Sequence, residues 1–399
     1  MIETTESLKA AAKSVEQYII GVRRALHASP ELGWKEDKTL ETIKGYVHDI
    51  DPSGTTFVLH EGKGGVWYDY TVHPDGVFRL FRSDVDALPI AEETGLCFAS
   101  TNGCMHACGH DMHPAMLLGA MKVIADGGIF ANLNIRFVFQ RAEENPVIKS
   151  GGATLVEDDG VLENVSNVHM LHVWPEKDYP PGTFGSRGGP MLANSDRVKV
   201  TIHCSGGHVA FPHQGSSATD IAADVSVGMR GFGERFFEPG EQYSFVNASI
   251  QSGEASNVRP GVATMWFAAR NFRDEAGRTL FEHAVRKAIT AIVLRYSDAS
   301  VDVDYVRGHP ALINDRNDVQ HTGGLLQQAG LAVKELPMTS GGEDFAHYLQ
   351  HCPGSAWVIG VHQDGTGPIH SPTFNPDESG MWYGVLFWLL LAYCPVRHP

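Results

Sequence analysis

The spacing of hydrophobic residues along the chain predicts helices near the N-terminus and then an alternation of strands and helices. Apolar residues recur at helical spacing over 9–28, and Pro30 and Gly33 end that helix. A stretch rich in Ala, Met and Leu predicts a further helix at about 113–126. Short β-branched and aromatic runs predict strands in TTFVL, GVWYDYTV, VFRLFRSDV, LNIRFVFQ (133–140) and VSNVHMLHVW (165–174). This order of elements predicts an α/β layered domain.

The pattern changes near residue 193, where the order becomes strand, helix, strand, strand, helix, strand. This order is typical of a ferredoxin-like split unit. The expected strands are 195–204, 243–252, 261–270 and 300–306, and the expected helices are 217–236 and 275–296. From residue 309 the α/β pattern resumes. We therefore expect an inserted domain at 193–308 within a domain made of 1–192 and 309–399.

Length and charge limit the classes of function. A chain of 399 residues favours two domains over one core, and 31 basic against 47 acidic side chains give a net charge of −16. This negative charge argues against nucleic acid or an anionic membrane as a partner. The N-terminus lacks an apolar signal core, and the apolar stretch 381–393 is too short to span a bilayer. We therefore expect a cytoplasmic protein, whose six cysteines do not form a disulfide scaffold.

Candidate metal ligands gather in CMHACGHDMH at 104–113, which holds two cysteines and three histidines. Cys108 and His110 are the strongest candidates, because thiolate and imidazole together favour zinc or another late first-row ion. Their spacing places both side chains on one face of an extended loop. A structural zinc site that also uses Cys104 is the alternative interpretation.

Two adjacent carboxylates follow a predicted strand, since RAEEN places Glu143 and Glu144 directly after 133–140. Open α/β sheets bind ligands at the carboxyl ends of their strands. One carboxylate of such a pair can bind a metal while the other moves a proton. A solvated acidic turn is the alternative. His172 and His370 are candidates only together with these groups, because a lone histidine at the position of His172 is more often a core residue and a loop histidine such as His370 is uninformative by itself.

Two further motifs offer supporting groups. FRSDVDALP gives Asp84 and Asp86 at a strand end, where either can orient a ligating histidine or simply cap a turn. CSGGHVAFPH supplies His208 within the expected inserted domain, where it is otherwise a surface histidine.

These motifs resemble those of the metal-dependent amidohydrolases that include hippurate hydrolases, bacterial aminoacylases, N-acetyl-diaminopimelate deacetylases and plant auxin-conjugate hydrolases. The resemblance covers nearly the whole chain. It implies an α/β layered catalytic domain with a central mixed sheet and a binuclear metal site, plus an inserted ferredoxin-like lid that also serves dimerisation. The ordered motifs are RRALHASPELGWKE, RSDVDALPIAEETG, GCMHACGHDMH, FQRAEE, SGGATLVEDDGVL, LHVWP, GGHVAFPH, SNVRP, SGGEDF and IHSPTF.

The resemblance also implies roles for residues of this sequence. Cys108 would bridge two divalent ions, zinc or manganese, and Glu143 would be the general base. Of the two aspartates at the strand end, Asp84 is the one that we expect to orient a ligating histidine. The remaining metal ligands would be His110, Glu144, His172 and His370.

On the lid, the resemblance implies that His208 helps to hold the developing oxyanion and can reach the site of a neighbouring subunit in a homodimer or larger homo-oligomer. Asn257 and Arg270 would hold polar groups of the substrate, often a carboxylate. Two residues depart from the family pattern. Arg141 stands where proline usually precedes Ala-Glu-Glu and is a candidate substrate contact, and Arg259 stands where an aliphatic residue is common.

We therefore predict a hydrolase that cleaves a C–N bond in a small, carboxylate-bearing substrate. The first choice is the amide of an N-acyl amino acid, attacked by a metal-activated water with Glu143 as base. A hydrolytic deaminase that releases ammonia from an aromatic or amidine-like amine is the alternative reaction. A non-enzymatic binding module of the same fold is the alternative of another class, and the complete set of metal and base positions argues against it.

Overall fold

The computed structural model of the chain describes residues 4–127, 133–144 and 149–393. The chain forms two compact units, the first made of 1–189, 314–337 and 347–399 and the second of 190–313 and 338–346. The sequence predicts that the chain leaves the first unit after residue 192 and returns at 309. In the structure it leaves after Gly189 and returns at Asn314, and the later segment 338–346 also belongs to the second unit.

An eight-stranded mixed sheet is the centre of the first unit among the described residues. Its four inner strands β4, β3, β5 and β16 are parallel to one another, whereas the flanking strands β2 and β6 are antiparallel to β4 and β16 respectively. The inner strands β4 and β16 are buried at every position, which fits the apolar runs FVF and AWVIG within them. In spatial order the strands are β1 (Val58–Glu61), β2 (Gly65–Tyr70), β4 (Asn134–Gln140), β3 (Phe78–Asp84), β5 (Val165–Trp174), β16 (Gly354–Gly360), β6 (Thr183–Ser186) and β15 (Ala332–Glu335).

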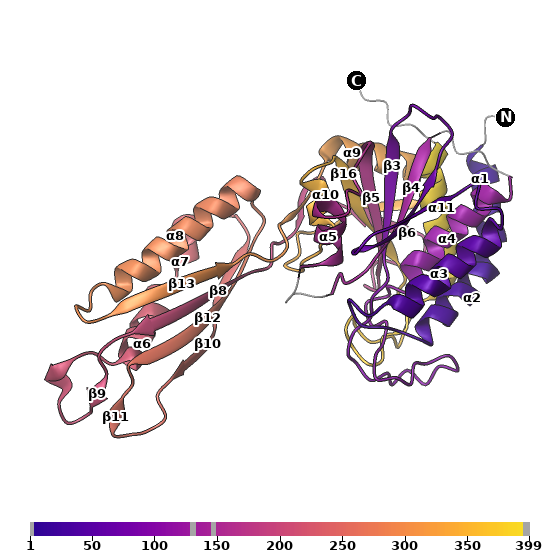
Figure 1. Cartoon of the computed structure of the whole chain (residues 1–399). Coiled ribbons are helices and arrows are strands. Elements are labelled where there is room, and N and C mark those ends of the chain that lie inside the picture. The colour runs from indigo at the N-terminus through magenta and orange to yellow at the C-terminus, as the bar shows by residue number, and fades with distance from the viewer. Residues whose placement is uncertain (1–3, 128–132, 145–148, 394–399) are drawn as a thin grey trace. The chain divides into compact units, whose positions relative to one another are not determined.

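Helices cover both faces of this sheet (Figure 1). The helices α4 and α11 are apolar on nearly all sides and pack against each other, and together with α1 and α2 they bury the main core. Among the described residues, no helix is long and apolar enough to cross a membrane. The helices are α1 (Thr5–Ser14), α2 (Glu16–His27), α3 (Asp37–Ile50), α4 (Met112–Ala125), α5 (Gly151–Glu157), α9 (Arg316–Gln328), α10 (Ala346–Leu349) and α11 (Met381–Tyr393).

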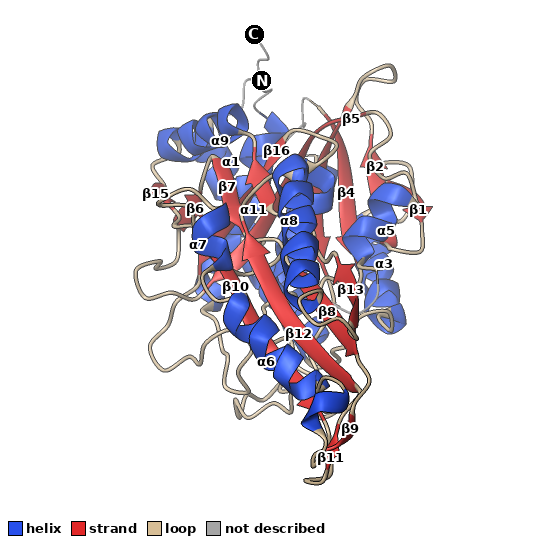
Figure 2. Cartoon of the chain, turned by 90° about the vertical axis from the view of Figure 1, so that its left-hand side faces the viewer, coloured by secondary structure: helices blue, strands red, loops and turns tan. Residues whose placement is uncertain are grey.

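The second unit is a four-stranded antiparallel sheet with helices on one face, as Figure 2 shows. Its core lies between the sheet and the helices α6 and α8, so the predicted ferredoxin-like unit is confirmed. In spatial order the strands are β10 (Tyr243–Ser252), β12 (Val262–Asn271), β8 (Asp196–His203) and β13 (Ser300–Val306), and the helices are α6 (Ala218–Gly228), α7 (Phe232–Phe236) and α8 (Glu275–Val293).

Two predicted helices are each divided in the structure. The expected helix 217–236 becomes α6 and α7, because Gly231 adopts a left-handed conformation with φ of 63° that an α-helix does not allow. The expected helix 9–28 becomes α1 and α2, which are separated at Val15. Hydrophobic periodicity continues across both breaks, so the sequence pattern alone does not reveal them.

The parallel strands place several loops at one edge of the first sheet. Since β3, β4, β5 and β16 run in the same direction, their carboxyl ends meet at one edge. The helix α4 connects β3 to β4, so the loop that precedes α4 also starts at this edge. Loops at such an edge are the usual place for a ligand site in an open α/β sheet.

Candidate metal centre

The predicted metal ligands come from four loops and strand ends at this edge. Cys108 and His110 lie just before α4, Glu144 follows β4, and His172 lies near the end of β5. His370 follows β16, and its backbone N–H donates to the carbonyl oxygen of Ala107 at 2.8 Å, which draws that loop to the cysteine loop. The structure therefore brings together all five side chains that the sequence singles out as ligands.

Two groups of potential ligand atoms share the same sulfur. In each group, one atom per residue lies within 4.8 Å of the others: Cys108, His110 and His172 in the first, and Cys108, Glu144 and His370 in the second. Glu143 completes a third group with His110 and Glu144. A sulfur atom common to two triads can be shared by two ions.

The tautomer of His172 is set by its backbone surroundings. Its Nδ1 lies 2.7 Å from the carbonyl oxygen of Val173, which can only accept, so the proton must be on Nδ1. The Nε2 atom then carries a lone pair, 3.4 Å from the sulfur of Cys108. Burial lowers the pKa of His172 to about 3, so its imidazole is neutral and ready to act as a ligand.

Two buried aspartates hold two different histidines. Asp86 lies 3.1 Å from Nδ1 of His110, while Asp84 lies 2.5 Å from Nδ1 of His113 and 3.9 Å from Nε2 of His110. The direct partner of the candidate ligand His110 is thus Asp86. Asp84, the aspartate that the sequence favours for this role, reaches the site chiefly through His113.

His113 is a residue of the centre that sequence reasoning missed. Its Nε2 accepts a hydrogen bond from the backbone N–H of Val173 at 3.0 Å, so this nitrogen is occupied and the ring is not a ligand. Its Nδ1–H side faces the carboxylate of Asp84. The signal in the sequence was its spacing of three residues from His110, which places it in the first turn of α4.

Burial and charge give the sulfur and the carboxylate opposite pKa shifts. Burial raises the pKa of the Cys108 thiol well above its usual range. Burial also tends to raise the pKa of Glu144, but its contact with His370, at 2.9 Å between Oε1 and Nε2, lowers that pKa overall. Glu144 is therefore an anion, and its backbone N–H donates to Asp86 at 2.9 Å.

The residues present fit a pair of divalent ions. The Nε2 atom of His110 is buried and makes no hydrogen bond to any described residue. A buried polar atom without a partner is costly, unless it binds a ligand such as a metal ion. One thiolate, three imidazoles and a carboxylate form a donor set suited to zinc, with manganese also compatible with the nitrogen and oxygen donors.

Close packing fixes the cysteine loop against β5. Gly109 has a φ of 88°, and a Cβ atom there would lie 2.3 Å from the side chain of Val173. Only glycine allows both this conformation and this approach. The loop thereby brings Cys108 and His110 next to His172.

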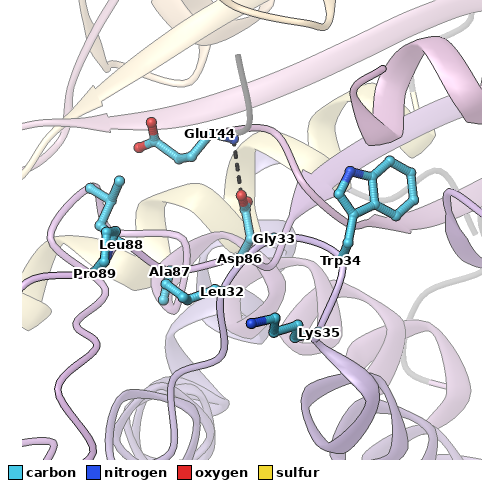
Figure 3. Close-up of a pocket in the computed structure, with 9 residues that line it drawn as sticks. All are labelled: Leu32, Gly33, Trp34, Lys35, Asp86, Ala87, Leu88, Pro89 and Glu144. Carbon is cyan, nitrogen blue, oxygen red and sulfur yellow. Dashed lines mark hydrogen bonds between the residues drawn. The ribbon is translucent and has the colours of Figure 1, made fainter. Parts of the chain in front are cut away.

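A pocket of about 390 Å³ adjoins the centre (Figure 3). Glu144 and Asp86 are two of its lining residues and are joined by the hydrogen bond described above. The remainder of the lining is mainly apolar, with one cation: Leu32, Gly33, Trp34, Lys35, Ala87, Leu88 and Pro89. The pocket has room for part of a small molecule next to the candidate ligands.

The predicted lid residues occupy two regions of the second unit. His208, in β9 (Gly207–His208), is exposed and pairs with Val258 of β11 (Val258–Arg259), directly after the exposed Asn257. Arg270 lies at the opposite end of β12, is half-buried, and donates to the carbonyl oxygen of Asn194 at 3.2 Å. Within this unit, His208 and Asn257 are neighbours, and Arg270 is apart from both.

The two arginines that depart from the family pattern have structural partners. Arg141 donates to Asp37 at 2.7 Å. Arg259 donates to the carbonyl oxygens of Phe211 and Gly215 and so tethers the loop that follows β9.

Comparison with known proteins identifies the family. The model of "Peptidase family M20/M25/M40" matches residues 80–393. An N-acetyl-L-cysteine deacetylase of Bacillus subtilis is 34% identical over 94% of this chain and 88% of its own length. A thermostable carboxypeptidase of Saccharolobus solfataricus is 31% identical over 98% of each chain.

A solved structure supports the same assignment. The crystal structure of a dinuclear metal-binding peptidase of the M20 family from Bacillus subtilis superimposes with a TM-score of 0.81 and 29% identity, over 95% of this chain and 98% of that one. The family resemblance and the fold expected from the sequence are both confirmed. The chain belongs to peptidase family M20/M25/M40.

Proposed function

We propose that this protein is a binuclear metal-dependent amidohydrolase that cleaves the amide bond of N-acyl amino acids. The observation that carries the proposal is the pair of ligand triads that share Cys108, with Glu143 beside them. Cys108 is assigned as the bridging ligand. The terminal ligands are assigned as His110, Glu144, His172 and His370.

Two divalent ions bound there would acidify a water molecule and polarise the amide carbonyl. The carboxylate of Glu143 accepts a proton from that water as the water oxygen attacks the carbonyl carbon. Glu143 then delivers the proton to the amide nitrogen while the C–N bond breaks, so the nitrogen leaves as a neutral amine. The products are a carboxylate and an amine, and the atoms of one water are divided between them.

The substrate class follows from what the relatives have in common. One is named a deacetylase of N-acetyl-L-cysteine and another a carboxypeptidase, so in both the nitrogen of the scissile amide belongs to an amino acid. The substrate proposed here therefore carries the α-carboxylate of that amino acid. Arg270 and Asn257 are assigned to its polar groups, with Arg141 as a further candidate, and His208 to the oxyanion, where one donor contributes about 3 kcal/mol.

A metal-reconstituted activity screen tests the proposal. The protein is loaded with Zn²⁺ or Mn²⁺ and offered N-acetyl amino acids, dipeptides and aromatic amines, and the products are identified by mass spectrometry. Release of an amino acid from the N-acetyl substrates is expected. Release of ammonia from the aromatic amines alone would replace this proposal with a deaminase.

Glu143→Gln provides the decisive variant. It should retain both ions but lose nearly all turnover, because an amide cannot accept the proton. Turnover near the wild-type level would remove Glu143 as the base. Metal content by mass spectrometry distinguishes this outcome from simple loss of the ions.

We also propose that the second unit mediates a homodimer or larger homo-oligomer, as the family resemblance implies. Light scattering of the full chain tests this directly. A monomer at micromolar concentration would contradict it.

A further inference from the structure

The loop that carries the proposed base and ligand is held in a strained conformation. Among the described residues, the non-glycine residues with positive φ are Trp34, Ala142, Asn164 and His370. Ala142, with φ of 53°, directly precedes Glu143 and Glu144. A left-handed conformation costs an alanine about 1–2 kcal/mol, so neighbouring groups must stabilise it.

The side chain of Glu36 supplies one such contact. Its Oε1 accepts a hydrogen bond from the backbone N–H of Ala142 at 2.8 Å, and the residue is fully buried. Glu36 stands at the start of α3 but does not cap that helix with its side chain. Its carboxyl group is therefore committed to the strained residue rather than to its own helix.

Other contacts fix the rest of the loop without duplicating this one. The N–H of Arg141 donates to the carbonyl of Gly64, and the N–H of Glu144 donates to Asp86. A Cβ atom at Gly33 would lie 3.2 Å from the Cα of Ala142, so the segment before α3 packs directly beneath the turn. Within the described part of the chain, Glu36 alone accepts a hydrogen bond from the backbone N–H of Ala142.

The geometry points to Glu36 as a positioning residue that fixes the turn at Ala142 and thereby aims Glu143 and Glu144. This inference rests on the proposed function for the roles of those two carboxylates. Because one acceptor oxygen holds the turn, its loss should allow Ala142 to relax and should displace both side chains. A displacement of about 1 Å at a reacting group can cost on the order of 100-fold in rate.

The environment of Glu36 indicates which substitution preserves the contact. Burial, together with the charge of Asp86, raises the pKa of Glu36 to about 7, so a large share of the side chain is neutral at physiological pH. The second oxygen, Oε2, is buried and accepts no hydrogen bond from the described part of the chain. Glutamine is neutral, has the same length and keeps a carbonyl acceptor, so Glu36→Gln should retain the contact.

The test compares Glu36→Ala, Glu36→Asp and Glu36→Gln in the metal-loaded protein. Ala removes the acceptor and Asp withdraws it by one methylene group. Both should lower kcat for N-acetyl-L-cysteine by about 100-fold with KM changed less than about threefold, while Gln keeps at least about one-third of the wild-type kcat. Should Glu36→Ala fail to fold, the contrast between Asp and Gln still decides the matter.

A second readout separates this inference from the proposed function. With Co²⁺ in place of the native ions and no substrate, the visible absorption bands report the ligand geometry at Glu144. Ala and Asp should alter these bands, and Gln should not. Glu31→Ala is the matched control, because Glu31 caps α3 at Thr39 in the same segment but does not contact the turn.

Unchanged cobalt spectra in both Glu36→Ala and Glu36→Asp would overturn the inference even if the protein hydrolyses another substrate. An equal loss in Glu36→Gln and Glu36→Ala would do the same, because it would show that the acceptor oxygen is not what matters. An altered spectrum without any amidase activity would support Glu36 while refuting the proposed function.

Discussion

The role open to each histidine of the centre depends on what its second ring nitrogen contacts. His172 places Nδ1 against a carbonyl oxygen and keeps Nε2 for a ligand. His113, three residues after His110, has both nitrogens engaged by Asp84 and by the N–H of Val173. Residue type therefore identifies the candidates, and the local hydrogen bonds separate ligands from supports.

At this scale, Cys108→Ala should lower the metal content by at least one ion per chain, because the sulfur belongs to both ligand triads. Since burial keeps the Cys108 thiol protonated at neutral pH, binding of ions to the wild type should also release about one proton more than binding to the variant. Calorimetry in buffers of different ionisation enthalpy measures this difference. Cys104→Ala is the control, and equal metal content in both variants would contradict the bridging role.

Arg270→Ala should raise KM for N-acyl amino acids by about 10- to 100-fold, the range expected for loss of a hydrogen bond to a charged group. The corresponding N-acyl amines, which lack the carboxylate, should be much less affected. Arg273→Ala is the matched control, because Arg273 pairs with Glu241 on the surface of the same unit. Equal effects on charged and uncharged substrates would refute a contact with the carboxylate.

At the scale of elements, a buried polar network joins α9 to two strands of the sheet. Asp318 of α9 contacts His169 of β5 at 3.1 Å and accepts from Ser355 of β16 at 2.5 Å. Burial tends to raise the pKa of Asp318, but the charge and hydrogen bonds of His169 and Ser355 lower it to about 2. The network lies away from the ligand loops, so a substitution in it tests the stability of the fold separately from metal binding and catalysis.

Asp318→Asn should lower the free energy of unfolding at pH 7 by about 2 kcal/mol, since each pKa unit corresponds to about 1.4 kcal/mol. A lowered pKa means that this stabilisation is present above the unfolded-state pKa, near 4, and is lost as the pH falls toward 2. The gap between wild type and variant in urea denaturation should therefore narrow between pH 7 and pH 3. Asp75→Asn, at an exposed loop position, should show no such gap. A gap that is independent of pH would contradict the assignment.

At the scale of the whole molecule, the two units have separate hydrophobic cores, and every assigned metal ligand belongs to the first unit. The free energy of binding the ions therefore stabilises the first unit directly. Ions at about 100 times their dissociation constant contribute about 2.7 kcal/mol.

Chelation should consequently lower the unfolding temperature of the first unit by about 5–10 °C, given about 2–4 °C per kcal/mol for a domain of this size. The transition of the second unit should move much less. Differential scanning calorimetry with and without a chelator measures both transitions. An equal shift of the two would show that the units unfold as one cooperative body.

The residue pattern is sufficient to predict most of the strands and helices and the residue types of the candidate ligands. Hydrophobic periodicity correctly predicts β4, β5 and the ferredoxin-like order of elements. The reason is that the buried faces of a strand or helix require apolar residues at a regular spacing within that same segment. The ligand types are equally legible, since few side chains can bind a late first-row ion.

Which side chains meet, and how each is held, becomes clear from the three-dimensional fold. Three hydrogen bonds of the centre join residues far apart in the chain. They pair His110 with Asp86, His113 with Asp84, and Glu36 with Ala142. Such contacts depend on strand register and on the direction in which each side chain leaves its loop. The spacing of residues along one segment specifies neither the register nor the direction. The contacts therefore form only in the folded chain, where the ends of four strands lie at the same edge of the sheet.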